Sequence, residues 1–110
     1  MATAHALTPA VVDATTVIGQ RIRRARQERG WTLVNLAERA GVSEKTVRSI
    51  EAGSPRTAIG TVFEVALLVG LDLLGRPESE LPALVARGRE VASLAPTRVR
   101  SSSPRVRDPF

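Results

Sequence analysis

Two short amphipathic patterns, separated by Gly41-Val42-Ser43, constrain the fold of this chain more than any other feature. The pattern before the tripeptide repeats apolar residues with a period of about 3.6, which predicts a helix with one buried face. Its apolar members are Leu33, Leu36, Ala37 and Ala40. The pattern after the tripeptide has only Val47 and Ile50. Together they predict a helix-turn-helix at about residues 32–53.

Polar residues and a glycine mark the ends of both predicted helices. Thr32 and Ser43 stand where N-caps are expected, because a hydroxyl accepts a hydrogen bond from a free amide of the first turn. Trp31 and Val42 precede these caps, each placed to form a hydrophobic staple with the helix that follows. Gly53 supplies a left-handed stop after the second helix.

The second helix has a polar outer face. Its outward side chains can all hydrogen-bond, as readers of base edges in a DNA major groove must. They are Glu44, Lys45, Thr46, Arg48 and Ser49. We expect Lys45 and Arg48 to contact bases or phosphates. Glu44 favours the helix N-terminus through the dipole. The alternatives are a contact to cytosine and a repulsion of phosphate that sharpens specificity. Thr46 and Ser49 either serve bases or are simply solvated.

Composition narrows the classes of function. The net charge of +5 and the pI near 11.4 favour an acidic partner, nucleic acid first, although an excess of arginine can also reflect codon bias. Without cysteine, disulfides, thiol catalysis and thiolate metal sites are excluded. We find no secretory signal and no apolar run of about 18 residues, so we expect a cytoplasmic protein with no membrane segment.

The remaining chain divides into supporting segments. Residues 1–14 are predicted to be a flexible lead-in, and residues 15–75 the DNA-binding domain. The first helix is expected over Thr16 to Arg29, with Ile18, Ile22 and Ala25 buried. Its arginines face either phosphate or solvent, and we favour solvent for Arg21 and Arg24.

The C-terminal third contributes two more helices and a tail. The fourth helix is predicted over Ala58 to Val69, capped by Thr57 and buried through Ile59, Val62, Phe63, Ala66 and Val69. Residues 76–94 are expected to add a fifth helix, from Ser79, with a stripe around Gly88 that is a candidate dimer surface. Residues 95–110 read as a disordered basic tail.

The motif resembles the XRE, or Cro/CI phage-repressor, family of helix-turn-helix regulators. The residues that carry the resemblance are Ile18-Gly19, Arg26, Arg29 to Thr32, Leu36-Ala37, Gly41 to Ser43, Val47, Ile50-Glu51 and Gly53. It implies an all-α, five-helix lambda-repressor-like domain that dimerises and binds a palindromic operator. More loosely, Gly60 to Val62, Leu68 to Leu74 and the basic tail resemble the HipB-like antitoxins, which act with a HipA-like kinase toxin.

The resemblance also implies roles for particular residues. Ser43 would cap the reading helix and touch phosphate, the residues from Glu44 to Ser49 would read DNA, and Arg56 would approach the backbone. Arg26 and Glu51 would form a buried ion pair between the first and third helices. The family often has Gln where this chain has Leu33, so one phosphate contact is expected to be missing.

Two functions from different classes follow. The chain is expected to be a dimeric DNA-binding repressor of its own gene, or an antitoxin whose residues 101–110 hold a toxin protein. An enzyme is not expected, because the single His5, the absence of cysteine and the scattered carboxylates offer no catalytic, cofactor or metal site. RNA binding is disfavoured because Trp31 and Phe63 look buried.

Overall fold

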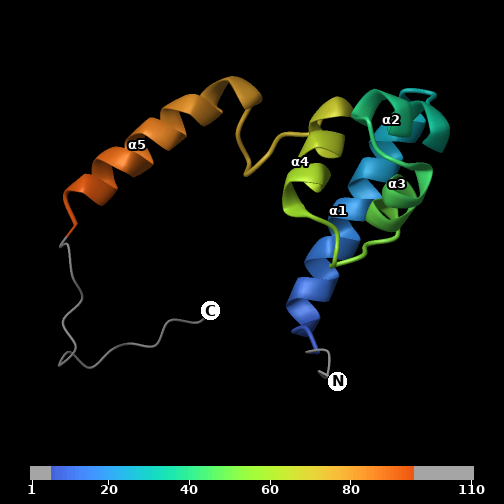
Figure 1. Ribbon diagram of the computed structural model, residues 1–110, viewed down its shortest axis with the longest axis horizontal. Coiled ribbons are helices and arrows are strands. Elements are labelled where there is room, and N and C mark those ends of the chain that lie inside the picture. Colours follow the sequence, from blue (N-terminus) through green and yellow to red (C-terminus); the bar gives the residue numbers. More distant parts are fainter. Residues whose placement is uncertain (1–5, 96–110) are drawn as a thin grey trace. The chain divides into compact units, whose positions relative to one another are not determined.

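The computed structural model describes residues 6–95, and these residues are helical apart from turns and one isolated bridge between Leu73 and Arg76 (Figure 1). The helices are α1 (Pro9–Glu28), α2 (Leu33–Ala40), α3 (Glu44–Glu51), α4 (Ile59–Leu68), the 3₁₀ turn η1 (Glu78–Glu80) and α5 (Leu81–Ser93). The predicted all-α class is confirmed. The chain separates into two compact units, residues 1–78 and 79–110.

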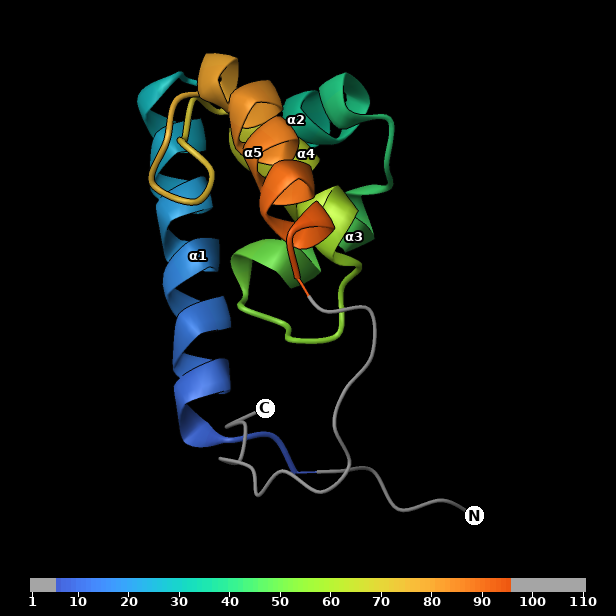
Figure 2. The same cartoon turned by 90° about the vertical axis from the view of Figure 1, so that its left-hand side faces the viewer.

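α1 begins at Pro9, so the predicted start at Thr16 is wrong and residues 9–14, expected to be flexible, are helical. Pro9 suits the first helical position, where its missing amide costs nothing. Thr15 and Thr16 look like helix starts in the sequence. Their hydroxyls instead donate back to the carbonyl of Val12, at 3.0 and 2.8 Å, which keeps them inside the helix. The first turns of α1 project beyond the other helices of this unit (Figures 1 and 2).

The buried face of α1 is also shifted from the prediction. Gly19, Ile22 and Arg26 are buried, whereas Ile18 is 40% exposed and Ala25 only half-buried. A Cβ at position 19 would lie 2.8 Å from the carbonyl oxygen of Glu51. Glycine at this position therefore lets α1 rest directly on the C-terminal carbonyls of α3.

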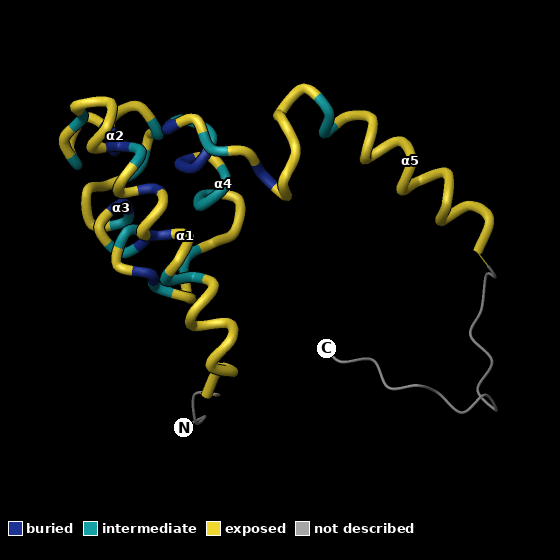
Figure 3. The backbone as a smooth tube through the Cα atoms, turned by 180° about the vertical axis from the view of Figure 1, so that it is seen from behind, coloured by how far each residue is buried: buried dark blue, intermediate teal, exposed yellow. Residues whose placement is uncertain are grey.

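The core of the first unit lies where α1 packs on α3 and where α2 packs on α3 and α4 (Figure 3). Leu36 and Val47 are completely buried, and Ile50 is nearly so, as predicted. On α4 the fully buried residue is Val65, which the predicted face omitted, while Ile59 is 70% exposed. The predicted cap is also wrong: Ala58 holds the N-cap position and makes no side-chain cap.

The second unit, considered alone, contains α5 and the last two residues of η1, and its described part ends at residue 95. α5 starts with Pro82 in its first turn, as predicted, and none of its residues is buried. It carries apolar side chains at i, i+3, i+4 and i+10, namely Leu81, Leu84, Val85 and Val91. The predicted tail covers residues 95–110, and all of it after residue 95 lies outside the described residues, as do residues 1–5 with His5.

We predict that Gly19→Ala destabilises the protein by about 1–3 kcal/mol, because the added methyl forces α1 away from α3. Gly60→Ala is the matched control. A Cβ there meets no atom within 4 Å, so the helix propensity of alanine should stabilise α4 by up to about 1 kcal/mol. Urea unfolding of both variants measures the difference. Equal stability of the two variants would contradict the close contact.

Candidate nucleic-acid interface

The turn between α2 and α3 is built from local hydrogen bonds. Gly41 adopts a left-handed conformation (φ 71°), and the Val42 amide donates to the Ala37 carbonyl at 3.0 Å. At the start of α2 the Thr32 hydroxyl accepts from the Asn35 amide at 3.0 Å, as predicted for an N-cap. In turn, the side-chain oxygen of Asn35 accepts a hydrogen bond from the Thr32 amide at 3.1 Å. Sequence reasoning missed this reciprocal partner because Glu or Gln usually occupies that position.

Ser43 caps α3 in the same way. Its hydroxyl oxygen accepts from the Thr46 amide at 3.1 Å and lies 3.0 Å from the Thr46 hydroxyl. Glu44 occupies the first turn, where its charge is favourable to the helix dipole. The predicted caps of both helices are confirmed. The Thr46 hydroxyl already has a bonding partner in Ser43, which reduces what it can offer a ligand.

The structure separates the residues expected to read DNA into two groups. Ser43, Glu44, Lys45, Arg48 and Arg56 are exposed, whereas Thr46 and Ser49 are half-buried. Lys45 is the only lysine of the chain and has no ion-pair partner within residues 6–95. Arg56 lies in the loop after α3, where its backbone amide donates to the Ser54 hydroxyl at 3.2 Å.

Glu44 and Arg48 lie one turn apart on α3 and form an ion pair with an N–O distance of 3.6 Å. The Arg48 side chain is 62% exposed and that of Glu44 is 48% exposed. A pair so solvated contributes little, between about 0 and 1 kcal/mol. Arg48 can therefore leave Glu44 for a stronger partner.

An ion pair between Arg26 of α1 and Glu51 of α3 holds the two helices together. Arg26 donates from Nε to Glu51 Oε2 at 2.6 Å and from NH2 to Oε1 at 2.9 Å. Its NH1 donates to the Trp31 carbonyl at 2.8 Å. The Arg26 and Glu51 side chains are only 10% and 6% exposed. The hydrogen bonds with Glu51 raise the pKa of Arg26, outweighing its desolvation, so Arg26 stays charged.

Trp31 anchors a second cluster that the sequence did not reveal. The guanidinium carbon of Arg39 lies 4.1 Å from the ring centroid and that of Arg29 lies 5.3 Å from it. Arg29 Nε also donates to the Val69 carbonyl at 2.9 Å, which satisfies the end of α4. Trp31 and Phe63 are half-buried rather than buried. Both arginines of this cluster therefore act partly as structural residues.

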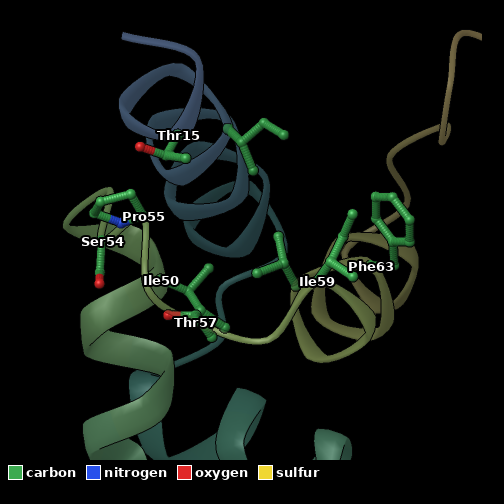
Figure 4. Close-up of a pocket in the computed structure, with 9 residues that line it drawn as sticks. Thr15, Ile50, Ser54, Pro55, Thr57, Ile59 and Phe63 are labelled. Carbon is green, nitrogen blue, oxygen red and sulfur yellow. The ribbon is translucent and has the colours of Figure 1, made fainter. Parts of the chain in front are cut away.

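Several hollows open on the first unit, and two of them differ clearly in chemistry. The first is apolar. It is lined mainly by α1, by α4 and by the loop that joins α3 to α4 (Figure 4). Its lining contains no charged side chain and comprises Thr15, Ile18, Ile50, Ser54, Pro55, Thr57, Ile59, Val62 and Phe63. The second is a cleft lined by Arg23, Arg26, Leu33, Arg48, Glu51 and Ala52. Of these two, only the second offers positive charge. A third hollow, near Leu71 to Gly75, is lined by one arginine, Arg21, and by Asp72.

Across residues 6–95 no group of three or more His, Asp or Glu side chains is placed to hold a metal ion. Within the same residues, no helix is both long and apolar enough to cross a membrane.

A capped two-helix unit with a glycine turn, clamped to α1 through Arg26 and Glu51, defines a helix-turn-helix domain. Residues 22–75 match the family described as Helix-turn-helix, and this domain belongs to that family, in its XRE type. Two curated relatives are the HTH-type transcriptional regulators SinR of Bacillus subtilis (strain 168) and Bacillus licheniformis, each 51% identical over 35 residues. The match covers 32% of this chain and 32% of each relative. No solved structure matches the chain.

We predict that Glu51→Gln lowers the free energy of unfolding by about 3–5 kcal/mol, because it leaves the buried Arg26 charge without its counter-ion. Glu28→Gln is the matched control. It breaks the exposed pair with Arg24 (3.3 Å) and should cost less than about 0.5 kcal/mol. Urea denaturation measures both. A double variant, Arg26→Met with Glu51→Leu, should recover most of this stability, and its failure to do so would point to a defect other than an unpaired charge.

Proposed function

We propose that this protein binds double-stranded DNA sequence-specifically as a homodimer and regulates transcription. The observation that carries the proposal is the division of α3 into two faces. Val47 and Ile50 fasten it to the core, while Glu44, Lys45 and Arg48 point to solvent with at most one exposed ion pair among them. A short, rigidly held helix with a polar outer face fits the DNA major groove.

The roles of the proposed contact residues follow from their exposure and chemistry. Lys45 offers an unpaired charge near the first turn of α3, and Arg48 offers a planar fork that suits guanine or phosphate. Ser43 and Arg56, at the two flanks of α3, are placed to approach the sugar-phosphate backbone. Thr46 and Ser49 are half-buried and are assigned supporting contacts. Glu44 favours the N-terminus of α3, pairs with Arg48 and repels phosphate, which restricts how α3 can dock on the duplex.

The polar face of a single α3 is too small to bind DNA tightly by itself, so the proposed mechanism requires a dimer. Two copies related by a two-fold axis place their reading helices about 34 Å apart, one turn of DNA, so the operator is a palindrome. We assign the contact between copies to α5, whose apolar stripe at Leu81, Leu84, Val85 and Val91 has no buried member. Gly88 lies within the stripe with open space around it, which favours close approach of a second helix.

The relatives support the regulatory part of the proposal, since both are named as transcriptional regulators. Repression of its own gene is the form of regulation we propose. Retardation of the DNA upstream of that gene at low salt tests it, and folded, dimeric protein that retards no such fragment would refute it. The antitoxin alternative stays a prediction from the sequence, because residues 101–110 lie outside the described part of the chain.

We predict that Lys45→Gln raises the dissociation constant for the preferred duplex roughly tenfold, since a direct base contact contributes about 1–3 kcal/mol. Its melting temperature should not change, because the side chain is exposed. The duplex is first selected by the purified protein from a random library. Arg24→Gln, which removes a similarly exposed charge from α1, serves as control. A lower melting temperature or an unchanged dissociation constant for Lys45→Gln would contradict this role.

We further predict that Leu84→Glu converts the dimer to a monomer in sedimentation equilibrium, because it puts a charge into the apolar stripe of α5. Ala86→Glu adds the same charge to the opposite side of the helix and should leave the dimer intact. Equal association of the two variants would show that copies meet elsewhere.

A further inference from the structure

The arginine-lined cleft is formed by three helices of the first unit. α1 contributes Arg23 and Arg26, α2 contributes Leu33, α3 contributes Arg48 and Glu51, and Ala52 follows at the end of α3. The cleft has a volume of about 250 Å³. It is therefore bordered by the same helix, α3, that carries the proposed DNA-reading face.

The charges around the cleft are not balanced. Three guanidinium groups and one carboxylate line it. Arg26 is already satisfied, because all three of its nitrogens donate to Glu51 or to the Trp31 carbonyl. Arg23 makes no ion pair within residues 6–95, and Arg48 has only the solvated contact with Glu44 at 3.6 Å. The excess positive charge therefore resides on Arg23 and Arg48.

We propose that this cleft binds one phosphodiester of the DNA backbone between Arg23 and Arg48. The inference rests on the proposed DNA binding and deepens it. A phosphodiester has one charge and two free oxygens, one for each guanidinium, and arginine is suited to such oxygens. Leu33 and Ala52 contribute apolar lining suited to the carbon atoms of a deoxyribose. An apolar or cationic ligand would lack this match.

The assignment changes the roles of the charged residues on α3. Arg48 becomes a backbone anchor shared with α1, and Lys45 is left as the main charged reader of bases. Because Arg23 belongs to α1 and Arg48 to α3, a phosphate held by both fixes the docking of the whole domain on the duplex. Such an anchor strengthens binding to every sequence and carries no base preference of its own.

Salt-dependent binding tests the proposal with three variants: Arg23→Gln, Arg48→Gln and the control Arg24→Gln, whose position lies outside the cleft lining. Dissociation constants are measured by fluorescence anisotropy over a range of salt, on the selected duplex and on an unrelated duplex. Each phosphate that a protomer no longer neutralises should lower the slope of log affinity against log salt by about 0.9. Near 0.1 M salt, affinity should fall roughly five- to tenfold for each such phosphate, equally on both duplexes.

The possible results distinguish failure of the cleft assignment from failure of the proposed DNA binding. If Arg23→Gln behaves like Arg24→Gln while wild-type protein binds both duplexes, the cleft assignment is wrong and DNA binding stands. Weaker binding confined to the selected duplex would also overturn it, because it would make the residue a base reader. Melting temperatures equal to wild type show that the variants are folded.

A second arm needs no DNA. Wild-type protein is titrated with inorganic phosphate while the guanidinium Nε–H signals of Arg23 and Arg48 are followed by NMR. Saturable shifts of both signals support the cleft as the anion site, provided that the Arg48 shift is smaller in Arg23→Gln and that both shifts are unchanged in Arg24→Gln. Absence of such shifts, in protein that also retards no duplex, overturns both the cleft and the proposed function. If the signals shift but the protein retards no duplex, the cleft is an anion site, and the DNA phosphodiester is refuted as its ligand.

Discussion

The buried ion pair between Arg26 and Glu51 is the interaction on which the rest of this domain depends. It joins the long helix α1 to the short helix α3 through two hydrogen bonds, of 2.6 and 2.9 Å, and a third bond ties Arg26 to the entrance of α2. An eight-residue helix is too short to be stable alone in water. Its orientation is therefore set by Arg26, by the close contact at Gly19 and by two buried aliphatic residues.

Because so few residues hold α3 in place, the helix can present a polar surface. Because Val47, Ile50 and the buried Glu51 are enough to hold the helix, its other positions are free to carry polar residues. The same ion pair also shapes the cleft next to it. Arg26 uses all its nitrogens internally, so Arg23 and Arg48 remain as the charges available to a ligand. Of the neighbouring arginines, Arg26 thus stabilises the fold, whereas Arg23 and Arg48 serve the proposed function.

The sequence predicts the helix-turn-helix well because its signals are local. Thr32, Ser43 and Gly41 act within one turn of their own positions, and the structure confirms both caps. Periodicity correctly places Ile22 on the buried face of α1 but misses Gly19 and Arg26, because it ignores glycine and arginine. The predicted start of α1 is too late, because the helix begins at Pro9 and the hydroxyls of Thr15 and Thr16 bond backward within it. The cleft joins three helices, and no local pattern reports such a juxtaposition.

The central claim is that α3 reads DNA from the major groove, with one copy on each half of a palindrome. Methylation interference on the duplex selected by the purified protein tests it most directly, because guanine N7 faces the major groove and adenine N3 the minor groove. The account predicts two patches of interference at guanine N7, about one helical turn apart. Interference confined to adenine N3, or to a single patch, would contradict it.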